Sequence, residues 1–135
     1  MRSMLMAAFL TAAATTTLAA QTAEKAAPAV EVSRAVVATG VENREPIGVA
    51  ESFPEDVGQV YFFTVIEGDF AEMQIEHVWL REGEEMARVP LTVRGPRWRT
   101  WSSKRIPADW SGKWSVRVVT ADDQVLSSVD FTVGT

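Results

Sequence analysis

One short segment, residues 94–105, gathers most of the side chains that are suited to recognition chemistry. Its sequence, RGPRWRTWSSKR, carries five positive charges, two tryptophans and no acidic residue. Side chains alternate along an extended backbone, so Arg97, Arg99 and Trp101 share one side of it, and Trp98 takes the other. Guanidinium groups bind anions through paired hydrogen bonds, and indole rings stack on flat sugar faces. The segment therefore predicts a surface that binds an anionic group or a glycan.

The same segment also admits a structural interpretation. One tryptophan would then fill the core, and the arginines would pair with acidic residues of the N-terminal half, such as Glu42, Glu45 or Asp56. In this interpretation the domain has a structural or assembly role, and residues 94–105 hold parts of the fold together as an internal crosslink of ion pairs. The binding hypothesis instead assigns a ligand or partner to six residues: Arg97, Trp98, Arg99, Trp101, Lys104 and Arg44.

Catalytic residues and cofactors are not expected. His77 is the only histidine and shares a predicted strand face with Ile75 and Trp79, which favours a hydrogen-bonded core position over a base or a ligand. With no cysteine and no second histidine, no zinc site is expected. Ser102 and Ser103 lie in neither a G-x-S-x-G nor an S-x-x-K motif. A hydrolase acting on envelope polymers is the least favoured alternative.

Charge is distributed unevenly along the chain. Residues 21–93 contain fourteen acidic and five basic residues, a net charge of −9, whereas residues 94–135 contain four and seven, a net charge of +3. This asymmetry predicts a dipolar surface. It argues against nucleic-acid binding, for which the whole domain is usually basic.

The first residues resemble a targeting signal. Arg2 is followed by an apolar run and then by small residues, which predicts a secretory signal peptide over residues 1–20. We expect a flexible leader over 21–29, a single domain over 30–135, and no membrane span after cleavage. The protein is then periplasmic or secreted, and without cysteine its fold depends on packing rather than disulfides.

The remaining sequence alternates with a period of two, and turn residues interrupt it at short intervals. This pattern is typical of antiparallel β-strands and predicts about seven of them. The chain is expected to form an all-β, immunoglobulin-like sandwich. The expected strands cover residues 30–39, 59–66, 74–81, 86–93, 98–106, 112–120 and 125–133.

Several single positions refine this expectation. Pro90 lacks an N–H group and is expected in an edge strand. Trp114 alternates with valines and is expected in the core, and Trp110 is expected to plug one end of the sandwich. Residues 42–46, Glu-Asn-Arg-Glu-Pro, are interpreted as a loop.

Several motifs together resemble a bacterial family catalogued as domain of unknown function 2914. They include residues 42–46, Tyr-Phe-Phe-Thr at 61–64, His77 with Trp79, and the block from Gly95 to Lys104. The resemblance extends over most of residues 30–133 and implies an extracytoplasmic β-rich domain. It implies no catalytic residues, because no activity is assigned to the family. The expected partners are an unknown protein or a cell-envelope glycan of a Gram-negative bacterium.

Overall fold

The regular structure of this protein is made of β-strands throughout the part that is described. The computed structural model describes residues 30–134. Its ten strands are β1 (Val30–Ala38), β2 (Gly40–Glu42), β3 (Glu45–Ile47), β4 (Ser52–Phe53), β5 (Gly58–Gly68), β6 (Met73–Arg81), β7 (Glu84–Val93), β8 (Arg97–Ile106), β9 (Gly112–Thr120) and β10 (Val125–Val133). The predicted signal peptide and leader lie outside the described residues.

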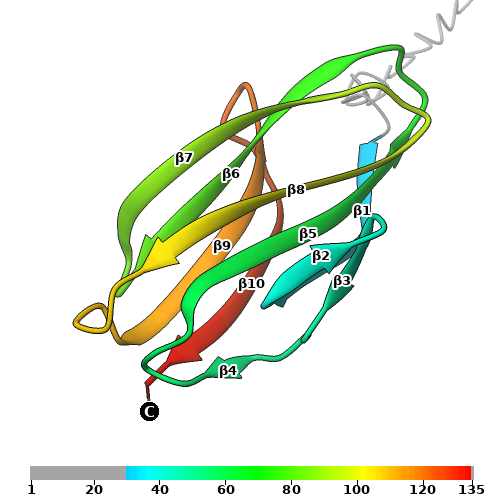
Figure 1. Cartoon of the computed structure of the whole chain (residues 1–135). Helices are drawn as coiled ribbons and strands as arrows, with labels where there is room; N and C mark the ends of the chain where they lie inside the picture. Colours follow the sequence, from blue (N-terminus) through cyan, green and yellow to red (C-terminus); the bar gives the residue numbers. More distant parts are fainter. Residues whose placement is uncertain (1–29, 135) are drawn as a thin grey trace, which may run out of the picture.

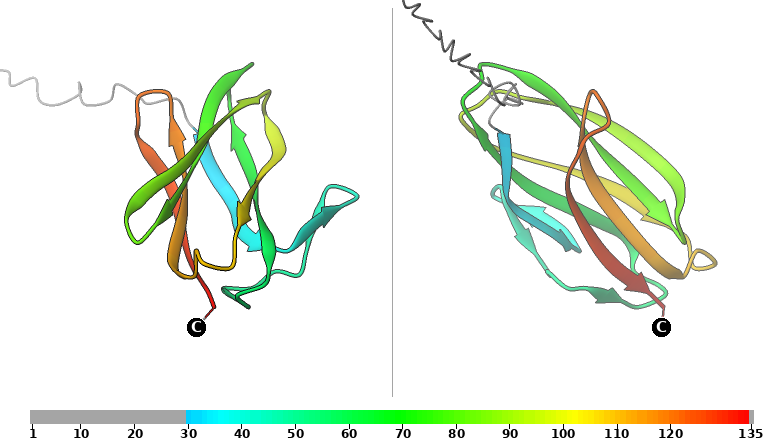
Figure 2. Two further views of the ribbon diagram at one scale, coloured as in Figure 1. Left: turned by 60° about the vertical axis from the view of Figure 1, so that its left-hand side comes forward. Right: turned by 180° about the vertical axis from the view of Figure 1, so that it is seen from behind.

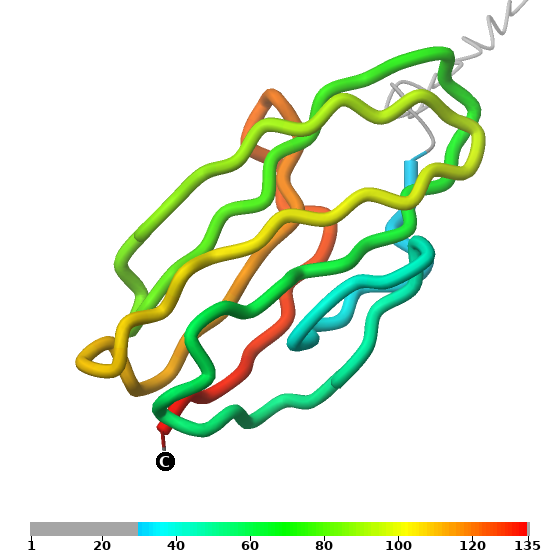
Figure 3. Tube along the Cα trace, viewed as in Figure 1, coloured from blue at the N-terminus to red at the C-terminus, as the bar shows by residue number. Residues whose placement is uncertain are grey.

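Two sheets pack face to face. One has the strand order β1-β5-β8 and the other β4-β10-β9-β6-β7. The three-stranded sheet faces the viewer in Figure 1. In the right-hand view of Figure 2, which shows the molecule from behind, the five-stranded sheet faces the viewer. The chain passes from one sheet to the other between β7 and β8, and Figure 3 traces this connection in yellow-green. It contains the cis peptide bond Gly95–Pro96. The predicted all-β sandwich is confirmed.

Large apolar side chains from both sheets fill the space between them. Trp79 of β6 is fully buried, and its ring meets Phe62 of β5 and Phe131 of β10 edge-on, at centroid distances of 6.3 Å. Trp114 is buried as expected. Trp110 packs against the same core, and its carbonyl accepts a hydrogen bond of 3.0 Å from the Trp114 indole. The end-plug role predicted for Trp110 is consistent with this contact.

The long strands follow the predicted pattern closely. The bounds of β9 and β10 agree with the expected ranges 112–120 and 125–133. Pro90 lies in β7, which forms one edge of the five-stranded sheet, as predicted. The three short strands were not predicted.

The segment interpreted as a loop, residues 42–46, is instead part of the β2–β3 hairpin. Glu42 pairs with Glu45, and Asn43 and Arg44 form the two-residue turn with φ angles of 53° and 63°. Two positive φ values define a type I′ turn, which usually has glycine at the second position. With arginine there, the sequence signal of the hairpin is weak. Figure 2 (left) shows this hairpin outside the two layers, on the side of the three-stranded sheet.

A candidate binding surface on the three-stranded sheet

Strand β8 separates the predicted binding residues onto two sides of the sheet. Thr100 and Ser102 are buried and point inward, so Arg97, Arg99 and Trp101 point outward. Trp98 packs against the core. This is the alternation expected from the sequence.

Of the remaining two predicted residues, Lys104 lies apart from this side and Arg44 contacts it. The Lys104 ammonium lies 5.0 Å from the ring centre of Trp110, a core-packed side chain at one end of the sandwich, and is therefore apart from Arg97 and Arg99. Arg44 is exposed in the hairpin turn, and its carbonyl accepts a hydrogen bond of 2.9 Å from Arg99 Nη1. The structure thus brings together four of the six predicted residues.

A third arginine side chain joins this surface from β1. Arg34 and Arg99 both pair with Val65 of the central strand β5, so they lie in one row across the sheet. Sequence reasoning missed Arg34, because it lies more than sixty positions from β8 and only the strand order β1-β5-β8 brings it close. We call Arg34, Arg97, Arg99 and Trp101 the basic face.

Aromatic side chains form the floor of the basic face. Phe63 points to the outer side of the sheet, yet it is fully buried. Trp101 stacks on it, with ring centres 5.9 Å apart and planes at 17°, and the Arg34 guanidinium lies 5.7 Å from the Phe63 ring centre. Strand β2 lies against β5, and β3 against β1, so the hairpin covers part of this side.

Two carboxylates neutralise part of the charge of the basic face. Glu45 bridges two arginines, with its Oε1 2.9 Å from Arg99 Nη1 and its Oε2 3.4 Å from Arg34 Nη1. Glu67 lies 3.0 Å from Arg97. The Arg99–Glu45 pair is the contact that the structural interpretation expected. Three guanidinium groups nevertheless share two carboxylates, and the side chain of Arg97 remains 59% exposed.

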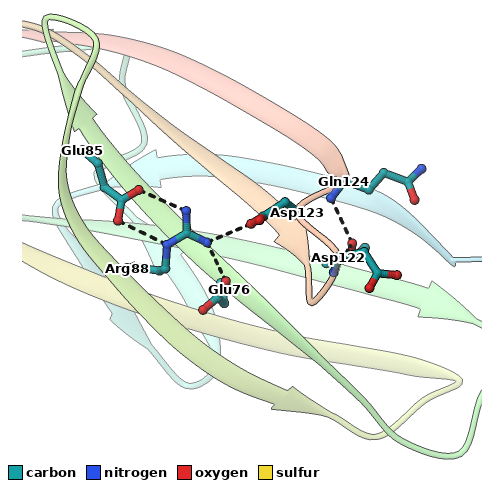
Figure 4. Close-up of polar contacts among 7 residues, drawn as sticks. Glu76, Glu85, Arg88, Asp122, Asp123 and Gln124 are labelled. Carbon is teal, nitrogen blue, oxygen red and sulfur yellow. Dashed lines mark hydrogen bonds and ion pairs between the residues drawn. The ribbon is translucent and has the colours of Figure 1, made fainter.

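One cluster on the outer side of the five-stranded sheet has the opposite balance. There, a single arginine, Arg88, contacts Glu76 at 2.7 Å, Glu85 at 3.0 Å and Asp123 at 3.2 Å (Figure 4). The hydrogen bonds to Glu85 and Glu76 raise the pKa of Arg88, and the bond from Arg88 lowers the pKa of Glu85. We call these four residues the Arg88 cluster. Four of the five N–H groups of its guanidinium donate to these carboxylates.

The third polar group lies in the core between the sheets. His77 Nδ1 is 2.7 Å from Ser102 Oγ, and His77 Nε2 is 3.2 Å from Thr64 Oγ1. Because the Thr64 hydroxyl donates to the Thr100 carbonyl, it accepts from Nε2–H, and Nδ1 accepts from Ser102. The sequence predicted a hydrogen-bonded core histidine, and this geometry confirms it, although the Ser102 partner was not anticipated.

This serine–histidine pair has a weak base. Desolvation by burial lowers the pKa of His77 to about 3, and its side chain is fully buried. A general base works best when its pKa is near the working pH. The far nitrogen bonds a threonine rather than the carboxylate that orients histidine in catalytic triads. The arrangement is suited to joining the two sheets.

The open grooves of the described residues lie apart from the basic face. One, of about 580 Å³, is lined largely by β9 and β10 and includes Glu51, Lys113 and Asp130. Another, of about 680 Å³, lies at one end of the sandwich and includes Asp56 and Arg105. Between residues 30 and 134, no group of three or more histidine, cysteine or acidic side chains could hold a metal ion. No helix that could cross a membrane occurs in this part of the chain.

Comparison with known proteins supports the resemblance noted in the sequence. Residues 72–133 match the family described as Protein of unknown function (DUF2914). This range runs from the start of β6 to the end of β10 and includes His77, Arg97, Arg99 and Trp101. No curated protein matches the chain. The family match and the strand content together describe a β-rich domain of unknown function.

Among solved structures, similarity is to small parts of large enzymes. A β-glucosidase from Listeria innocua in complex with glucose is 10% identical with a TM-score of 0.44, covering 78% of this chain and 16% of that one. A β-glucosidase from Kluyveromyces marxianus in complex with glucose is 10% identical with a TM-score of 0.46, covering 82% and 14%. The chain thus spans about a sixth of the length of these enzymes or less.

Proposed function

We propose that this protein is a non-catalytic binding module, periplasmic or secreted, that holds an anionic polymer of the cell envelope on its basic face. The observation that carries the proposal is an excess of positive charge. The guanidinium groups of Arg34, Arg97 and Arg99 are paired with only two carboxylates. An arginine fork matches a carboxylate with two hydrogen bonds, and several forks in a row suit a repeating anion.

The aromatic floor supports the same proposal. Trp101 is half-buried on the outer side of β8 and lies on Phe63, which fixes the orientation of the indole. An indole with one edge open to solvent offers apolar contact to a sugar ring. Arginines beside an ordered tryptophan suit an acidic polysaccharide better than a small free anion.

The test is calorimetric titration with oligogalacturonate, an acidic polysaccharide of defined length. The wild-type protein is expected to bind oligogalacturonate at low salt and not to bind dextran, which is a neutral polysaccharide. The double variant Arg97→Ala with Arg99→Ala is expected to lose at least tenfold in affinity, because a charge-assisted pair contributes about 1.5–3 kcal/mol.

The matched control is the double variant Lys113→Ala with Arg117→Ala. It also removes two positive charges, but from exposed positions on β9 in the other sheet. This control is expected to change affinity less than twofold. Equal losses in both double variants would show that only net charge matters and would refute a site on the basic face.

A purely structural role is the second candidate, and the bridging position of Glu45 favours it. The arginines would then hold the hairpin on the sheet and bind nothing else. In that case, the wild-type protein would show no binding to the oligogalacturonate, and Arg99→Ala would lower stability without any functional loss. Urea unfolding of the same variants separates the two candidates.

A further inference from the structure

Glu45 occupies the position that a bound anion would take on the basic face. Its two carboxylate oxygens contact different guanidinium groups, Oε1 with Arg99 and Oε2 with Arg34. Those arginines come from the two edge strands of the three-stranded sheet, so the carboxylate spans the central strand β5. One acidic group bound between two arginines is a common way for proteins to hold a carboxylate.

Among the described residues, the backbone hydrogen bonds that attach the Glu45 hairpin to the rest of the fold lie at its base. There, Thr39 N–H donates to the Ile47 carbonyl at 3.1 Å, and Ala50 N–H donates to the Val37 carbonyl at 3.2 Å. Strands β2 and β3 pair with each other and with neither large sheet. Within residues 30–134, the hydrogen bonds and ion pairs that hold the turn to the sheet all involve Arg34 or Arg99.

The contacts at the turn are exposed. The side chains are 46% exposed for Arg34, 50% for Glu45 and 35% for Arg99. Exposed ion pairs are individually weak and are screened by salt. A fixed base and a weakly held turn allow the carboxylate to leave the arginines while the fold stays intact.

We infer that Glu45 is a tethered competitor for the ligand: the ligand group recognised by Arg34 and Arg99 is a carboxylate, and it binds by displacing the hairpin turn. This inference rests on the proposed function. It adds the chemical class of the recognised group and a built-in control of affinity. A tethered carboxylate acts at an effective concentration in the millimolar range, so a single free carboxylate competes poorly and a chain of them competes well.

Glu45→Gln tests the inference, because it keeps the side-chain shape and removes the competing charge. Its affinity for oligogalacturonate is expected to rise by about threefold to tenfold. The matched control is Glu42→Gln, which removes one charge from the residue paired with Glu45 across the same hairpin. Glu42 makes no ion pair among the described residues, and its substitution is expected to change affinity less than twofold.

The outcomes separate this inference from the proposed function. If neither the wild-type protein nor Glu45→Gln binds the oligogalacturonate, the proposed function fails. If the wild-type protein binds and the two glutamine variants gain equally, the function stands, and Glu45 is not a competitor. If heparin, whose charge is dominated by sulfate, gains as much from Glu45→Gln as oligogalacturonate does, the assignment of a carboxylate is overturned.

Discussion

Two arginine sites on opposite outer faces of the sandwich, the Arg88 cluster and the basic face, differ in their balance of charges. In the Arg88 cluster, one guanidinium contacts three carboxylates from β6, β7 and the β9–β10 loop. On the basic face, three guanidinium groups share two carboxylates. The first arrangement joins neighbouring elements and commits four of the five N–H donors of its arginine to carboxylates of the same chain. The second leaves capacity for another anion, so the balance of partners, and not the presence of arginine, distinguishes a brace from a binding surface.

A change of pH tests the core between these faces and gives the largest expected effect. Because the pKa of His77 is about 3 in the folded protein and 6.5 in an unfolded chain, its contribution to stability is full above pH 6.5. It is lost as the pH falls towards 3, since only the unfolded state then binds a proton readily. From pH 7 to pH 5, the free energy of unfolding in urea should fall by about 2 kcal/mol.

His77→Phe is the control for this pH effect. It is less stable at pH 7, because Ser102 and Thr64 lose their buried partner, but its stability should be nearly constant from pH 7 to pH 5. The substitution leaves the residues of both surface clusters in place. A fall of equal size in His77→Phe would assign the pH effect to the surface instead.

Gly48→Ala tests the base of the hairpin, which covers part of the three-stranded sheet. Gly48 has a φ of +70°, and a Cβ there would clash with the Thr39 hydroxyl oxygen. The substitution should cost about 1–2 kcal/mol in urea unfolding. It should also expose Trp101 and increase quenching of its fluorescence by iodide. Unchanged stability and quenching would mean that the base does not hold the hairpin in place.

Arg88→Ala tests the brace directly. It leaves Glu76, Glu85 and Asp123 without their shared cation, so their repulsion adds to the lost hydrogen bonds. The urea midpoint should fall by more than it does for any single arginine substitution on the basic face, and added salt should reduce the difference. Oligogalacturonate binding should be unaffected. A stability equal to that of the wild-type protein would remove the contrast between the two faces.

Arg97→Ala has the smallest expected effect on stability. Its side chain is 59% exposed and has one partner, Glu67, so the free energy of unfolding should change by less than about 0.5 kcal/mol. Its affinity for oligogalacturonate should nevertheless fall severalfold. A large loss of stability would show that Arg97, like Arg88, mainly stabilises the fold.

The fold was largely predictable, because burial repeats every second residue in the long strands. In β9, Trp114, Val116 and Val118 are all buried core residues, and their spacing alone located the strand. The separation of Arg97, Arg99 and Trp101 from Trp98 was predicted for the same reason. The resemblance to the family was also visible in the block around Arg97, and it is confirmed over residues 72–133.

The missed features depend on long-range geometry or on unusual local chemistry. The Ser102–His77 bond joins strands of different sheets, and Arg34 reaches Arg99 only across β5. Neither contact has a local sequence signal. The hairpin was missed because Arg44 adopts a left-handed conformation that usually requires glycine or asparagine.

The central claim is that the basic face, and not the opposite sheet, holds a carboxylate polymer. Titration of the isotopically labelled protein with oligogalacturonate, followed by backbone and indole N–H chemical shifts, tests it most directly. We predict that the largest shifts occur at Arg34, Arg97, Arg99 and the Trp101 indole, and that the hairpin turn also responds. Shifts centred instead on the groove of Glu51, Lys113 and Asp130, or no shifts at all, would contradict the account.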